Sequence, residues 1–308
     1  MALFKRILVD IDSDAAVHPA LERAILLARD GGATVTVTDV MAGSPYERRH
    51  WSADLEEAVL ARRRSQLTRI ASMVRDVGTE AKLLIGRPAT ALIQEVIRAG
   101  HDLLMRSHAR DESGAAARDF GAVDMELLRE CPCAVMLVRP SSAAQQPRIA
   151  AAVNAGAVDA AEQALNVKIA TSAVDLAERL GGVPMLLHAW SPFGERMIRA
   201  HASEDAFATY VEEARTRAAA DLNTLTQSLG SRLRAVPIIQ RRGRPEDVIL
   251  ESVTAEGVDL LVMGTVARGG IPGLVFGNTA ERVLRKLRCS VLTLKPDNFV
   301  SSVRVVGD

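Results

Sequence analysis

The chain has 308 residues, and its 38 lysines and arginines balance its 38 aspartates and glutamates. This length suits two domains of ordinary size, each able to bury a core. A net charge of zero and an aromatic content of 3% argue against a nucleic-acid partner, because no basic tail and no base-stacking surface is evident. No apolar run is long enough to cross a bilayer, and no signal peptide precedes the first strand pattern. Three cysteines are too few for a disulfide framework. These features predict a soluble, cytoplasmic protein.

In the first half, short apolar runs typical of buried strands alternate with segments of helical periodicity. The strand patterns lie at 6–12, 33–40, 81–85, 102–106 and 134–139, and the helical patterns at 18–30, 52–77, 88–99 and 122–130. Such alternation predicts crossover connections and a parallel sheet.

A short segment of small and polar residues with one proline follows at 141–147 and predicts a linker. After it the alternation resumes. Strand patterns lie at 148–154, 184–190, 235–240, 258–263 and 290–295, and helical patterns at 160–180, 202–229, 245–256 and 278–288. Ser203, Pro88 and Pro245 are helix-start signals. We therefore expect one domain over 1–140 and a second over 148–308.

The two halves also match in the order of short sequence features. Gly86-Arg87-Pro88 corresponds to Gly243-Arg244-Pro245, Asp102-Leu103-Leu104 to Asp259-Leu260-Leu261, and Cys133–Pro140 to Cys289–Pro296. Matched order over the whole length indicates duplication of a domain of about 140 residues, a typical domain size.

A glycine-rich turn between a strand pattern and a helix pattern is the main candidate site. It covers Met263–Ala280 and follows the apolar run Val258–Val262. Such a turn exposes backbone N–H groups at the positive end of a helix, where anions and above all phosphates bind. Taken alone the signal is weak, because Gly269–Gly273 would equally form a plain loop and Gly277 a helix cap.

The spacing within this turn resembles a known nucleotide-binding motif. Gly264, two residues, Ala267, nine residues and then Gly277-Asn278 are similar to the motif of the universal stress protein family. That motif has Gly in place of Ala267 and Ser or Thr in place of Asn278. The runs Gly277–Glu281 and Leu287–Cys289 resemble the tandem universal stress proteins of the bacterial E type. The resemblance implies two doubly wound α/β domains, each with five parallel strands in the order 3-2-1-4-5.

The same resemblance implies where a ligand would bind. In family members that bind ATP, an Asp ends the first strand, the backbone after the second strand contacts adenine, and the glycine motif holds ribose and phosphates. The matching positions here are Asn154, Ala189, Met263, Gly264, Ala267, Gly277, Asn278 and Thr279. We therefore expect ATP, another adenine nucleotide or another anion in the second half, with no catalytic residue and no metal.

Three of these residues affect the expected binding. Gly264 and Gly277 would allow close approach of backbone to an anion or a positive φ. Ala267 would carry a penalty of about 1 kcal/mol if its turn requires a positive φ.

The first half keeps the acidic residue, Asp12, but lacks the rest of the motif. No glycine stands at the position of Gly264, Asp111 and Glu112 add negative charge, and Ala122-Val123 replaces Asn278-Thr279. We expect this half to bind no nucleotide and to act as a scaffold, with Asp12 capping a loop.

The last strand pattern of each half is apolar on both faces and would lie at a sheet edge, which seeks a partner. Pairing of Ala134–Val138 with Val291–Leu294 would join the halves as a pseudo-dimer with pseudo-twofold symmetry. Further oligomerisation is left open.

The remaining residues form no catalytic or metal-binding pattern. Cys131 and Cys133 are too close together and too isolated for a zinc site, and we interpret the cysteines as small core residues. The histidines show no metal-ligand spacing, and His188 is interpreted as a packing residue. No Walker loop and no nucleophile elbow occurs.

These features predict a binding or regulatory protein of the stress response whose protein partners the sequence leaves unnamed. One alternative is a weak ATP hydrolase or autophosphorylating protein that uses the same pocket, although no general base is evident there. Others are an interaction module without a ligand, or a binder of an apolar or acyl ligand. Ile271, Leu274, Val275 and Phe276 would contribute to the last.

Overall fold

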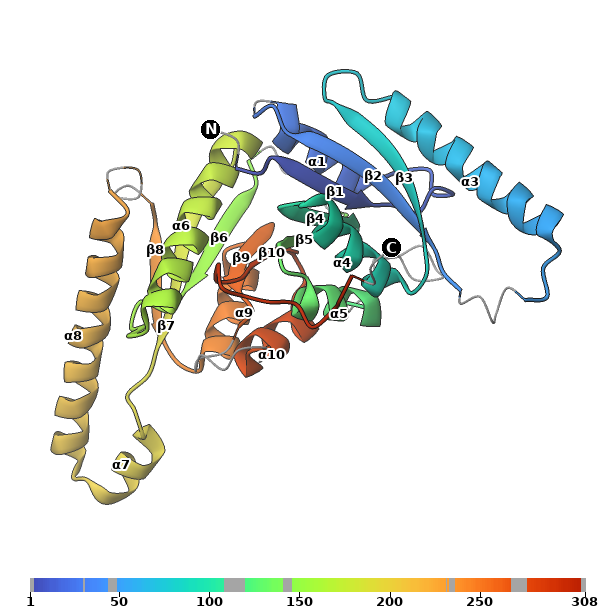
Figure 1. The fold of residues 1–308 in the computed structure, drawn as a ribbon. Coiled ribbons are helices and arrows are strands. Elements are labelled where there is room, and N and C mark those ends of the chain that lie inside the picture. The colour runs from blue at the N-terminus through green and yellow to red at the C-terminus, as the bar shows by residue number, and fades with distance from the viewer. Residues whose placement is uncertain are drawn as a thin grey trace. The chain divides into compact units, whose positions relative to one another are not determined.

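The computed structural model describes residues 3–29, 31–43, 49–107, 120–140, 146–230, 232, 236–266 and 276–305. These residues form two compact units (Figure 1). Within the described ranges, the first unit holds 3–140 and 290–305, and the second holds 146–266 and 276–289. Of the sequence predictions, those for Ala267, Gly269–Val275, Asp111 and Glu112 lie outside the described residues. The linker at 141–147 and the domain limits built on it stay predictions.

The first unit is a parallel sheet with helices between its strands. Its parallel strands are β1 (Arg6–Asp10), β2 (Thr34–Met41), β3 (Thr79–Ile85), β4 (Leu103–Ser107) and β5 (Ala134–Val138). They lie in the order β3-β2-β1-β4-β5, which confirms the expected order. The central strands are buried on both faces because helices cover each face.

The helices of the first unit are α1 (Pro19–Arg29), α3 (Ala53–Ser72), α4 (Pro88–Ala99) and α5 (Ala122–Glu130). Chain order runs from β1 outward to β3 and then returns to β4 and β5. Right-handed crossovers therefore place α1 and α3 on one face and α4 and α5 on the other, and α4 packs against α5. The direction reverses between β1 and β4, which is where ligands bind in open parallel sheets.

A strand from the end of the chain completes the first unit. β10 (Ser290–Leu294) pairs antiparallel with β5, with Val291 opposite Leu137 and Thr293 opposite Val135. The Thr293 hydroxyl donates to the Val135 carbonyl at 3.3 Å, inside the pairing. The predicted pairing of the two final strands is thereby confirmed, while the pseudo-twofold relation of the two halves stays a prediction.

The second unit repeats the architecture. Its strands β6 (Arg148–Val153), β7 (Val183–Trp190), β8 (Ile238–Arg242) and β9 (Leu260–Gly264) are parallel, in the order β9-β6-β7-β8. Its helices are α6 (Ala160–Leu180), α7 (Glu195–His201), α8 (Glu204–Ser228), α9 (Pro245–Ala255) and α10 (Asn278–Lys286). α6 packs on α8, and α9 packs on α10, as expected for two covered faces.

Helix boundaries follow the local signals closely, with one exception. The Ser203 hydroxyl accepts the Ala206 N–H at 3.3 Å, and Pro88 and Pro245 open their helices as predicted. The exception is α7, which was not predicted and which begins after Gly194, whose φ is 63°. None of its side chains is buried, so it carries no apolar periodicity to detect. No helix in the described part of the chain is both long and apolar enough to cross a membrane.

Candidate ligand site in the second unit

The carboxyl ends of three neighbouring strands bring most of the predicted site residues to one edge of the second sheet. Ala152 of β6 is in register with Met263 of β9, and Val153 with His188 of β7. Asn154 directly follows β6, Met263 and Gly264 end β9, and Ala189 follows His188 on β7. This edge lies where the strand order reverses, between β6 and β9.

The start of α10 is tied to the same edge. Gly277, the N-cap residue, donates its N–H to the carbonyl of Thr265 at 2.8 Å, one residue beyond β9. Inside the helix, the Glu281 N–H bonds to the Gly277 carbonyl. The N–H groups of Asn278 and Thr279 precede this bond and point out of the helix, at its positive end. A glycine N-cap has no side chain to accept them.

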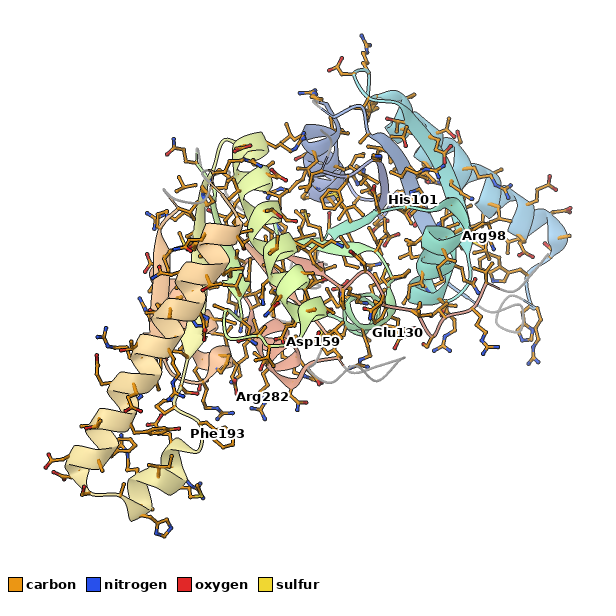
Figure 2. The ribbon with its side chains drawn as sticks, turned by 60° about the vertical axis from the view of Figure 1, so that its left-hand side comes forward. Arg98, His101, Glu130, Asp159, Phe193 and Arg282 are labelled. Carbon is orange, nitrogen blue, oxygen red and sulfur yellow. The ribbon has the colours of Figure 1, made fainter. Side chains whose placement is uncertain are left out.

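Helix α6 holds Asn154 through both its backbone N–H and its backbone carbonyl. The Asn154 N–H donates to Asn166 Oδ1 at 2.9 Å, and the Asn154 carbonyl accepts from Asn166 Nδ2 at 2.8 Å. The Asn154 side-chain amide donates to Glu162 Oε1 at 2.6 Å. Asp159, labelled in Figure 2, caps the helix by accepting from the Ala161 and Glu162 N–H groups. The predicted residue Asn154 therefore carries a carboxylate partner, Glu162, which the sequence analysis missed.

The two glycines of the candidate motif are not in the left-handed region. Gly277 has a φ of −65°, and Gly264 is absent from the glycines with positive φ. Of the two roles expected for these glycines, a positive φ is therefore excluded, and close approach of the backbone to an anion stays a prediction. A Cβ at Gly264 would lie 3.0 Å from Leu165 Cδ2 and 3.5 Å from Ile169 Cδ1, so the close packing of α6 on β9 leaves little room for a side chain there.

Two buried polar side chains lie beside this edge. Thr265 is 1% exposed, and its hydroxyl has no hydrogen-bond partner among the described residues. A buried hydroxyl left unpaired costs about 1–3 kcal/mol. His188 is buried, and burial lowers its pKa, so the ring is neutral at pH 7. Its Nδ1 lies 3.2 Å from the Val153 carbonyl, which agrees with the predicted packing role.

In the first unit, charged side chains occupy the corresponding edge. Arg106 of β4 pairs with Asp10 of β1, and its Nε lies 3.1 Å from Asp124 Oδ1 at the start of α5. Asp124 also accepts the Gly121 N–H at 3.2 Å, which caps α5. Burial raises the pKa of Asp10 to about 7, although the Arg106 charge opposes this shift. Asp12 accepts the Asp14 N–H at 3.0 Å, as predicted for a loop cap.

The second unit lacks this network at the equivalent positions. Strand register and helix caps align Asp10 with Ala152, Arg106 with Met263, and Asp124 with Ala280. All three replacements are uncharged. Among the residues that the structure describes, the N-terminus of α10 therefore lacks the equivalents of the Arg and the Asp that cover α5.

The comparison with known proteins agrees with the repeat and the fold. The sequence profile described as "Universal stress protein family" matches residues 3–139 and again 156–295. The chain belongs to the universal stress protein family. It is a tandem member, with two family domains in one chain.

Full-length relatives of this universal stress protein carry the E designation. Universal stress protein E of Escherichia coli (strain K12) is 30% identical over 318 aligned positions, covering 99% of this chain and 98% of that protein. The protein of the same name from Photorhabdus laumondii is 27% identical, with 100% of each chain covered.

Solved structures show the same fold. A functionally unknown protein from Pseudomonas aeruginosa PAO1 has a TM-score of 0.71 at 22% identity, covering 96% of this chain and 94% of its own. A universal stress protein from Archaeoglobus fulgidus DSM 4304 has a TM-score of 0.61 at 14% identity, covering 94% and 96%.

Two features of the candidate site in this universal stress protein were not predicted, namely the Glu162 partner of Asn154 and the buried Thr265 hydroxyl that has no partner among the described residues. Glu162 had one available signal, since it stands in the first turn of a helix that starts beside Asn154. No sequence signal indicated that the Thr265 hydroxyl would be buried. Among the residues that the structure describes, no group of His, Cys, Asp and Glu side chains is arranged to hold a metal ion.

Proposed function

We propose that this universal stress protein is a binding or regulatory protein of the stress response, and that it holds an adenine nucleotide or another phosphate-bearing ligand in its second unit. The proposed contacts are Asn154, Ala189, Met263, Gly264, Gly277, Asn278 and Thr279, together with Ala267 outside the described residues. Its free thiols support a reducing, cytoplasmic location.

The contrast between the two units carries this proposal. At one edge of each sheet, a helix begins with its N–H groups directed outward. In the first unit Asp124 caps that helix, and Arg106 binds both Asp124 and Asp10. In the second unit Ala280 and Met263 leave the positive end of α10 to a ligand, which favours an anion.

The polar groups around this edge suit a nucleotide. The Glu162 carboxylate beside Asn154 is an acceptor for the hydroxyls of a ribose, and it supplies the negative charge that Asn154 lacks. The Thr265 hydroxyl would gain a partner that the described residues do not provide. These groups would form hydrogen bonds to a ligand but supply no reactive centre, so we propose that the protein binds the ligand without robust catalysis.

Calorimetric titration of the full chain with ATP, AMP and inorganic phosphate tests the proposal. We expect heat of binding with ATP and AMP, and a loss of affinity of about tenfold, or about 1.4 kcal/mol, in Asn278→Asp. The new carboxylate occupies the first position of α10, where the helix dipole favours it, so folding is retained while the anion is repelled. Ala122→Asp places the same charge at the first position of α5 and serves as the control, with unchanged affinity.

Two results would count against this function. Absence of binding at millimolar nucleotide would leave the protein as an interaction module or a binder of apolar ligands. Equal affinity in Asn278→Asp and the unaltered protein would move the site away from α10. Assay of phosphate release in the same samples tests the hydrolase alternative, for which we expect no turnover above the Asn278→Asp background.

A further inference from the structure

Two thiols stand together at the end of α5 in the first unit. Cys131 directly follows Glu130, the last residue of α5, which is labelled in Figure 2. Cys133 stands one residue further, immediately before β5. The Cys131 and Cys133 sulfurs are 3.5 Å apart, with one thiol hydrogen-bonded to the other. Cys131 is fully buried and Cys133 is partly buried. Neither residue belongs to the proposed nucleotide site.

A buried ammonium group lies against this pair. Lys295, the residue after β10, is 5% exposed, and its Nζ donates to the Cys131 carbonyl at 2.6 Å and to the Arg129 carbonyl at 2.8 Å. The same nitrogen lies 4.0 Å from the centre of the Phe299 ring. The carbonyls at the end of α5 and the aromatic face thus hold a positive charge next to the thiols.

The surroundings shift the pKa values of the two thiols in opposite directions. Burial raises the pKa of Cys131, but the hydrogen bond from Cys133 and the Lys295 charge outweigh burial, so the pKa of Cys131 is lowered. Burial and the neighbouring Cys131 raise the pKa of Cys133 well above its usual value. One sulfur is therefore prepared as a nucleophile while the adjacent sulfur keeps its proton.

We propose that Cys131 and Cys133 form a reversible disulfide, which makes the first unit a thiol sensor for hydroperoxides. The Cys131 thiolate attacks a peroxide oxygen, the O–O bond breaks, and proton uptake gives Cys131 sulfenic acid together with water from hydrogen peroxide or an alcohol from an organic hydroperoxide. The Cys133 thiol then attacks the sulfenic sulfur, losing its proton, and the displaced hydroxyl leaves with that proton as water. The two thiols lose two electrons and the peroxide gains them. A dithiol reductant reverses the change by thiol–disulfide exchange.

The second repeat shows that packing does not require this pair. Leu287 stands at the position equivalent to Cys131 and is 0% exposed, so an apolar side chain fills that place. Cys289 matches Cys133 but has no second cysteine two residues before it. In the first unit, shortening the sulfur separation to about 2.05 Å closes a small ring across Pro132, and a strained bond of this kind is easily reduced.

Peroxide treatment of the folded full chain, followed by alkylation in denaturant and peptide mass spectrometry, tests the proposal. We expect the peptide carrying Cys131 and Cys133 to lose two hydrogens and to escape alkylation, while Cys289 is alkylated. Dithiothreitol should restore both thiols. In Cys133→Ser, Cys131 sulfenic acid should accumulate and be captured by dimedone.

Lys295→Met tests the role of the ammonium group while keeping an unbranched chain against Phe299. We expect the rate of disulfide formation to fall about tenfold, because the thiolate fraction falls by that factor for each unit of pKa. Lys286→Met removes an exposed lysine of α10 and should leave the rate unchanged. Oxidation of Cys289 before the pair, or linkage of Cys131 to Cys133 only in urea-unfolded protein, would overturn the proposal.

Discussion

At the scale of single residues, the two units carry different side chains at equivalent positions. Asp10 and Ala152 stand at equivalent places in equivalent strands, yet one is a buried carboxyl in a charge network and the other a methyl group. A buried carboxyl that is hard to ionise costs stability at neutral pH, so its retention in the first unit needs Arg106 as a partner. The charged side chains cover this edge in the first unit, and uncharged residues stand at the equivalent positions in the second.

Asp10→Asn makes this cost measurable. The folded-state pKa of about 7 lies above the ordinary 3.8, so the folded protein binds the proton more tightly. The resulting stability is present below pH 3.8 and is lost as the pH rises through 7. We therefore expect the unfolding free energy of Asp10→Asn, relative to the unaltered protein, to rise with pH between 4 and 7, by up to about 1.4 kcal/mol per pH unit. Urea unfolding of both proteins at several pH values measures this difference in unfolding free energy. A difference that does not change with pH would contradict the raised pKa of Asp10.

At the scale of elements, α6 builds much of the candidate site. It supplies Asn166 and Glu162 to hold Asn154, and it supplies Leu165 and Ile169 to the surface packed on Gly264. The position of this one helix therefore determines both the polar contacts and the apolar packing of the candidate site. The glycine that a motif search would assign to ligand approach also has this packing role.

Gly264→Ala should lower the unfolding free energy by about 1–3 kcal/mol, because its Cβ would press on Leu165 at 3.0 Å. Adding Leu165→Ala removes the clash, so the double variant should lose less than the sum of the single changes. Gly78→Ala is the matched control, since its Cβ would meet only Thr34 at an ordinary 3.8 Å. Additive losses in a double-mutant cycle would show that the two residues do not press on each other.

The elements were predictable where local signals were strong. α4 has Pro88 at its start and Gly100 at a φ of 68° at its end, and its predicted limits are those observed. α6 likewise ends before Gly181, at a φ of 64°. α7 was missed because it buries nothing. For the site, the strand ends were predictable from topology. Contacts such as Arg106 to Asp124 and Lys295 to Cys131 were not, because they join distant segments through side chains whose direction no periodicity encodes.

At the scale of the whole molecule, the chain does not divide into its two compact units at a single point. β10 comes from the second repeat in sequence but pairs with β5 in the first unit, and Gln94 of α4 donates to the Arg304 carbonyl at 2.9 Å. The C-terminal segment thus covers an edge of five buried or half-buried residues, Ala134–Val138, that would otherwise lie open.

A chain that ends before Ser290 should therefore melt at a lower temperature and self-associate through the open β5 edge. A chain that ends after Phe299 keeps β10 and Lys295 and should behave nearly as the full chain. Thermal unfolding and light scattering after gel filtration measure both effects. A shortened protein that stays monomeric with unchanged melting would show that β10 is dispensable for the first unit.

The position of β10 late in the chain affects the order in which the first unit can be completed during synthesis. A ribosome translates β5 long before β10, so the nascent first unit emerges with its last edge unprotected and waits for almost the entire remaining polypeptide. Only a chain that has been elongated past Leu294 can seal that edge. Chains terminated before Ser290 would thus present the apolar strand β5 to chaperones and proteases, and the fold itself would distinguish chains that contain β10 from chains that lack it.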